Sequence, residues 1–107
     1  VEPLRVSVPT DGAPLPGGPY DAVVASLALH AIVGHEVDRA EAESRYELLF
    51  QSILEPLRPG AHCLVGDHVG TLDLYAQLKA MERAGFAEVD CAWRQDDFFV
   101  AGGRKSP

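Results

Sequence analysis

The pattern of apolar and polar positions predicts a chain in which strands alternate with helices. Residues 22–27 and 62–66 are short, almost continuously apolar runs bounded by turn residues, which is typical of strands covered on both faces. Between them, over 38–55, apolar side chains recur at helical spacing with acidic residues on the other side, and a second helical pattern covers 71–84. This alternation predicts parallel strands joined by right-handed helical crossovers.

Two further strands are predicted near the end of the chain. Residues 87–93 alternate between apolar and polar positions, and 97–102 form an apolar run, so a short turn over 94–96 would join them as an antiparallel hairpin. A short alternating run over 4–8 predicts one more strand near the start. The expected fold is therefore a single α/β domain spanning 1–107, with helices on the faces of a mostly parallel sheet and an antiparallel hairpin at its end.

The amino-acid composition indicates which classes of molecule the protein would bind and where it would be located. The 107 residues carry a net charge of −7, whereas an electrostatic grip on nucleic acid needs an excess of Lys and Arg. The sequence has no apolar run near the roughly 20 residues that span a bilayer, and its first residues do not resemble a signal peptide. Cys63 and Cys91 lie in apolar runs and are expected to be buried free thiols. These features predict a cytoplasmic protein that binds a small molecule or another protein.

Several short motifs precede or follow the predicted strands in a fixed order. They are Asp11, Leu15-Pro16 and Tyr20-Asp21 ahead of the apolar run 22–27, the segment LRPGA over 57–61, and AGF over 84–86 before the closing hairpin. Together these motifs resemble the carboxyl-terminal half of class I S-adenosylmethionine (SAM)-dependent methyltransferases. The resemblance covers nearly the whole chain and implies a partial Rossmann-like methyltransferase sheet.

The resemblance also implies which residues would contact SAM. The carboxylate of Asp11 would accept a hydrogen bond from the adenine amino group, a small neighbour would lie beside the ring, and the residues after the strand 22–27 would flank the methionine part. The implied cofactor-binding residues are Asp11, Gly12, Ala13, Ser26, Leu27 and His30. An alternative for Asp11 is a local turn, which aspartates in loops often form.

One wall of the family's cofactor site has no counterpart in this sequence. The family's glycine-rich turn and the acid that holds the ribose hydroxyls are not found before Leu4. We therefore expect this chain alone to bind SAM weakly or not at all, and activity of this chain alone is doubtful.

Three polar residues follow the two buried runs and are the catalytic candidates. His30 could act as a general base, since the reference pKa of histidine lies near neutrality, or it could hydrogen-bond a neighbouring loop. Asp67 and His68 end the next strand and are the best-placed polar groups for a substrate, although Asp67 could instead accept bonds from backbone amides. The spacing of histidines and acids matches no metal-ligand pattern, so no metal is expected.

Two functions remain open at this point. The leading hypothesis is a methyltransferase-family protein acting on a small molecule, and the alternative is a non-catalytic remnant of that fold that serves as a dimerising or regulatory binding module. In the family's strand order the run 22–27 would lie at an open sheet edge, and an unpaired apolar edge favours association. We therefore predict a homodimer, through this edge or an exchanged amino-terminal strand, or else a partner chain that supplies the missing strands.

Overall fold

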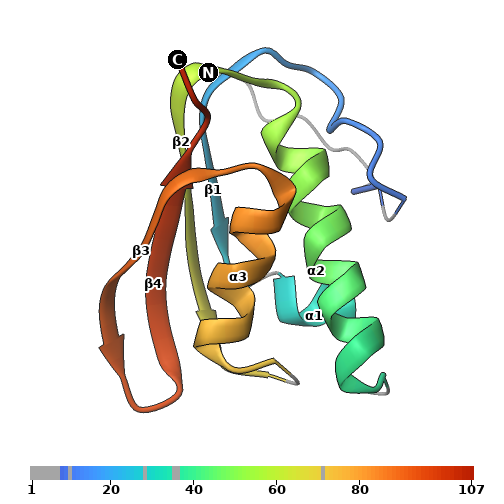
Figure 1. The fold of residues 1–107 in the computed structure, drawn as a ribbon, viewed down its shortest axis with the longest axis vertical. Helices are drawn as coiled ribbons and strands as arrows, with labels where there is room; N and C mark the ends of the chain where they lie inside the picture. The colour runs from blue at the N-terminus through green and yellow to red at the C-terminus, as the bar shows by residue number, and fades with distance from the viewer. Residues whose placement is uncertain (1–7, 10, 28, 35–36, 71) are drawn as a thin grey trace.

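The computed structural model consists of a four-stranded sheet with helices packed against one of its faces (Figure 1). The structure describes residues 8–9, 11–27, 29–34, 37–70 and 72–107. The elements in chain order are β1 (Tyr20–Ser26), α1 (Leu29–Val33), α2 (Arg39–Leu54), β2 (Leu57–His68), α3 (Leu74–Ala84), β3 (Ala87–Gln95) and β4 (Phe98–Arg104). No helix in these ranges is long and apolar enough to cross a membrane.

The predicted strands after residue 20 and both predicted helices are present, with different limits. β2 begins at Leu57, five residues before the predicted strand, so the LRPGA motif lies within the strand. The hairpin turn falls at Asp96-Asp97, slightly later than predicted. The short helix α1 was not predicted, and the strand expected over 4–8 lies outside the described residues except for Val8.

The strand order is β1-β2-β4-β3, and it corrects the prediction of a mostly parallel sheet. Only β1 and β2 pair in parallel, whereas β2 with β4 and β3 with β4 are antiparallel. The reason is the position of β4. The tight hairpin turns the chain back, and β4 then lies between β2 and β3 and separates two strands that run in the same direction.

Both long helices lie on the same face of the sheet, which corrects the expectation of helices on both faces (Figure 1). The crossovers from β1 to β2 and from β2 to β3 step in the same direction across the sheet, and two right-handed crossovers of that kind leave their helices on one side. The runs predicted to be covered on both faces are therefore covered on one. Val24 in β1 remains 69% exposed and Leu64 in β2 remains 45% exposed.

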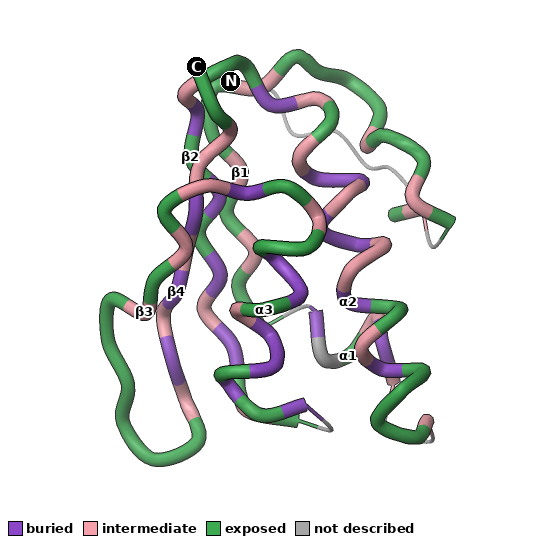
Figure 2. The backbone as a smooth tube through the Cα atoms, in the orientation of Figure 1, coloured by how far each residue is buried: buried purple, intermediate pink, exposed green. Residues whose placement is uncertain are grey.

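The core lies between the sheet and the helices (Figure 2). Inward side chains of β2 and β4, among them Cys63, Val65 and Phe99, pack against buried residues of α2 and α3. Both described cysteines are free, as predicted, but Cys91 is only partly buried. α2 and α3 each begin at an aspartate whose carboxylate accepts a backbone N–H.

Candidate functional site

The loop before β1, which contains Asp11, Gly12 and Ala13, is held against α2. The Ala13 N–H donates to Asp11 Oδ1 at 3.0 Å, so this carboxylate forms the local turn considered as the alternative. Gly12 has φ +86°, and a Cβ there would lie 3.2 Å from side-chain atoms of α2. The N–H of Leu15 donates to the Ser52 carbonyl at 3.0 Å. These contacts fix the loop beside β1, on the side away from β2.

A hollow of about 440 Å³ lies between this loop, the edge of β1 and the helices α1 and α2. It is lined by Val8, Leu15, Val23, Val24, Ala25, Ser26, Leu29, Ile32, Leu49 and Ile53. Of the residues that the resemblance assigns to SAM, Ser26 lines this hollow, whereas Asp11, Gly12 and Ala13 do not, although Val8 and Leu15 on either side of them do. Leu27 follows Ser26 with φ 54° and donates its N–H to the Gly66 carbonyl at 2.7 Å. His30 lies in α1, but its side chain is outside the described part.

The residues of the hollow suit one side of SAM. Its volume falls in the range of about 300–1,000 Å³ that is usual for small-molecule sites. Nine of the ten lining residues are apolar, which suits the flat adenine ring, and Ser26 supplies a hydroxyl near the end of β1. Asp11 is exposed and retains acceptor capacity beyond its bond to Ala13, since a carboxylate can accept several hydrogen bonds. The described lining is thus apolar with one hydroxyl, from Ser26, and Asp11 lies outside it.

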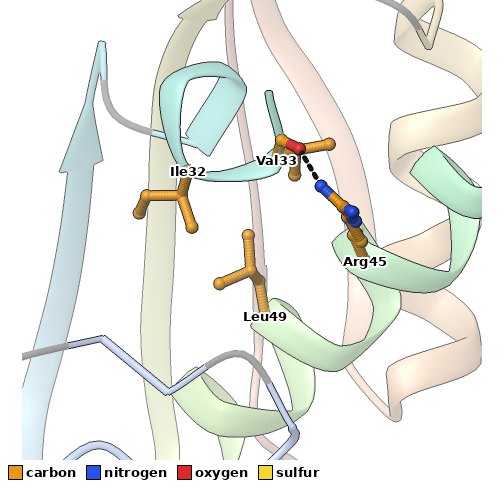
Figure 3. A pocket seen from close by; sticks show the side chains of 4 residues that line it. All are labelled: Ile32, Val33, Arg45 and Leu49. Carbon is orange, nitrogen blue, oxygen red and sulfur yellow. Dashed lines mark hydrogen bonds between the residues drawn. The ribbon is translucent and has the colours of Figure 1, made fainter. Parts of the chain in front are cut away.

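A second hollow of about 330 Å³ adjoins the first and is lined by Ile32, Val33, Arg45 and Leu49 (Figure 3). Arg45 reaches from α2 toward α1, and its Nη1 donates to the Val33 carbonyl at 2.7 Å. Its Nη2 donates to Glu41 Oε1 at 2.6 Å. The guanidinium therefore ties α1 to α2 and positions the helix that borders both hollows. This contact of Arg45 was not predicted from the sequence.

Asp67 ends β2 on the helical side of the sheet, and it is completely buried. Its Oδ1 accepts the His68 N–H at 2.8 Å. Burial, together with the negative charge of Asp67, raises the pKa of Tyr46 in α2 to about 12. The Tyr46 phenol is consequently protonated at neutral pH, next to a buried carboxylate.

His68 points to the opposite, open face of the sheet, because successive side chains of a strand alternate. Its Nδ1 lies 3.3 Å from Asp97 Oδ2, and its ring meets the Phe98 ring edge-on with centroids 5.3 Å apart. Asp97 was missed from the sequence, since only the hairpin brings it to the end of β2. Asp67 and His68, predicted as a pair, thus face different environments. His68 instead pairs with Asp97, an arrangement in which a carboxylate orients an imidazole.

Comparison of the sequence with protein families and with curated proteins gives no match. Comparison of the structure gives clear similarities. PigF with SAH has a TM-score of 0.58 at 12% identity, over 85% of this chain and 32% of that one. An O-methyltransferase family protein from Burkholderia thailandensis has a TM-score of 0.57 at 17% identity over the same shares. A possible exported protein from Bordetella parapertussis has a TM-score of 0.57 at 15% identity, over 94% and 41%.

The resemblance seen in the sequence is confirmed at the level of the fold. This chain spans about a third of the length of the O-methyltransferase structures that it matches. It has the fold of the carboxyl-terminal part of SAM-dependent O-methyltransferases.

Proposed function

We propose that this chain forms part of a SAM-dependent methyltransferase that acts on a small molecule, with a hydroxyl as the methyl acceptor. The observation that supports the proposal is the apolar hollow beside β1, which Ser26 lines, in a chain with an O-methyltransferase fold. One of the similar structures is PigF with SAH, and SAH is SAM after loss of its methyl group. The acceptor class is taken from the similar structure from Burkholderia thailandensis, which is described as an O-methyltransferase family protein.

In this proposal the chain contributes binding and proton transfer. SAM, when bound, supplies a methyl group on a sulfonium sulfur. Ser26 would hold a polar group of the cofactor at an otherwise apolar wall, and the exposed carboxylate of Asp11 would accept from the adenine amino group. A base is needed because a hydroxyl that accepts a methyl group must lose its proton. Catalysis of this kind depends mainly on placing the acceptor in line with the methyl group.

Among the predicted bases, His68 has a carboxylate beside its ring, but its side chain points to the open face of the sheet and does not line the hollow. With Asp97 beside Nδ1, the Nδ1–H tautomer is favoured, and Nε2 is the atom that would take the proton. His30 stays a second candidate. Asp67 would position the His68 backbone, since its buried carboxylate accepts a hydrogen bond from the His68 N–H.

The cofactor site can be tested by NMR with the uniformly ¹⁵N-labelled chain and SAH. We expect binding only in the millimolar range, equivalent to about 4 kcal/mol, because this chain supplies one wall of the site. Amide shifts should be confined to residues 11–15 and 26–32. Saturating SAH that shifts no amides, or shifts that cluster elsewhere, would refute the proposed site. Micromolar binding of SAM that Asp11→Ala abolishes would instead contradict the expected weak affinity.

A matched pair of variants separates the role of Asp11 from a general loss of charge. Asp11→Asn should reduce the SAH-induced shifts severalfold, because the neutral amide accepts less strongly from the adenine amino group. Asp90→Asn is the control. Asp90 is likewise exposed and accepts a local backbone N–H, from Cys91 at 2.8 Å, but it lies in β3. Equal effects of the two substitutions would argue against a cofactor contact at Asp11.

The second candidate function is a non-catalytic binding module of the same fold. The specific observation in its favour is the uncovered face of the sheet, where the large apolar side chains of Val24, Leu64 and Trp93 are 69%, 45% and 48% exposed. Exposed apolar surface of this kind commonly marks an interaction site. Absence of SAH binding, together with specific self-association, would favour this candidate.

A further inference from the structure

The helix α1 has only five residues, Leu29–Val33. Isolated helices shorter than about 12–15 residues are marginal in water, and the last four carbonyl groups of any helix lack partners within it. Part of the support for α1 comes from its inward side chains, since Leu29 and Val33 are 3% and 1% exposed. The position of α1 therefore depends on its contacts with the rest of the domain.

Arg45 of α2 supplies a polar contact at the end of this helix. Its Nη1 donates to the Val33 carbonyl at 2.7 Å, and this carbonyl is one of those that α1 leaves unpaired (Figure 3). Its Nη2 donates to Glu41 Oε1 at 2.6 Å, one turn earlier in α2. The guanidinium is thus held between a carboxylate of its own helix and the last carbonyl of α1. Because the donor is charged, this hydrogen bond is stronger than one between neutral groups.

α1 forms part of the wall of the larger hollow beside β1. Leu29 and Ile32 of α1 line this hollow, together with Ser26 at the end of β1. Arg45 lies outside the described lining of this hollow and borders the smaller one, with Ile32 and Val33. Any effect of Arg45 on a ligand in the larger hollow therefore passes through α1.

We propose that Arg45 is a positioning residue of the cofactor site, which keeps α1 in place through the Val33 carbonyl while Glu41 orients its guanidinium. This inference rests on the proposed function, because it gives Arg45 a role in the binding of SAM. Without the contact, a larger fraction of molecules has α1 displaced, and only the fraction with α1 in place binds. The apparent affinity for the cofactor then falls in proportion to that fraction.

Arg45→Met tests this contact by NMR, because methionine keeps an unbranched side chain but has no N–H donor. Circular dichroism should show the variant folded, since the Arg45 side chain is 43% exposed. The ratio of ordered to displaced α1 should fall roughly 10-fold, read as Cα shifts of residues 29–33 that move toward random-coil values. The SAH-induced amide shifts of residues 26–32 should shrink severalfold at the same SAH concentration.

Arg83→Met is the matched control. The Arg83 side chain is 44% exposed, and its Nε lies 3.7 Å from Glu47 Oε2 of α2, but Arg83 belongs to α3. Its substitution removes the same charge and should leave both the Cα shifts of α1 and the SAH-induced shifts unchanged. Arg45→Lys should restore part of both signals, because an ammonium group also donates to a carbonyl. Glu41→Gln should act in the same direction as Arg45→Met but more weakly, since the contact with Val33 remains.

The role of Arg45 and the cofactor site fail in different ways. An Arg45→Met chain that keeps α1 ordered, that binds SAH undiminished despite a displaced α1, or that does not fold would overturn the role of Arg45 alone. Equal effects of Arg83→Met would overturn it too, because the loss would then follow from charge. If SAH shifts no amides of the unaltered chain, the proposed cofactor site is refuted, and this role of Arg45 with it.

Discussion

Burial of Cys63 predicts a specific loss of stability in alkaline solution. The thiol lies in β2 with 0% of the residue exposed, and burial raises its pKa from the usual 9.0 to about 12. Unfolding returns the thiol to water, so above pH 9 the unfolded chain loses a proton that the folded chain retains. The free energy of unfolding should therefore be unaffected by this group below pH 9, and should fall as the pH rises from 9 toward 12.

The size of the effect follows from the pKa difference. Three pH units between the two values correspond to about 4 kcal/mol. Tyr46 adds a contribution of the same sign between about pH 10 and pH 12, because its pKa is also raised to about 12. Domains of this size have stabilities of about 5–15 kcal/mol, so the buried thiol alone removes a large share.

Urea unfolding of the unaltered chain and of Cys63→Ala between about pH 8 and pH 11 measures this contribution. The variant should be less stable near pH 8, because it loses buried contacts, but the gap should narrow by roughly 1 kcal/mol per pH unit above pH 9. Cys91→Ala retains Cys63 and should keep the steep decline. Parallel curves for the unaltered chain and Cys63→Ala over the whole range would refute the reasoning.

Four further substitutions test the packing and the capping of α3. A Cβ at Gly102 would lie 2.7 Å from the Cys63 carbonyl oxygen, so Gly102→Ala should cost about 1–3 kcal/mol in urea unfolding, whereas Gly66→Ala, with its nearest atom at 3.7 Å, should cost less than about 1 kcal/mol. Asp73→Ala removes the carboxylate that caps α3 and should lower the unfolding free energy by about 1 kcal/mol, as read by thermal unfolding. Phe50→Ala should cost about 3–5 kcal/mol, since Phe50 is 1% exposed, and a loss below about 1 kcal/mol would contradict the described core.

Parts of the candidate site were accessible from the sequence because they depend on neighbouring residues in the chain. Ser26 was chosen from the motifs and lines the hollow, whereas the predicted contact of Asp11 with SAM stays a prediction. The pairing of His68 with Asp97 was not accessible, because it depends on the position of β4 beside β2. The link from Arg45 to α1 was missed for a similar reason, since that short helix left no periodic pattern.

The sequence by itself determined the long helices and the strands from residue 20 onward, because their apolar periods and capping residues act over a few residues. Tertiary structure decided the strand order and the single covered face. A continuous apolar run such as 22–27 predicts a strand that is buried, but it does not show which segment of the chain packs against it. Whether Val24 is buried is decided by the direction of the crossovers, and these place both long helices on the side away from it.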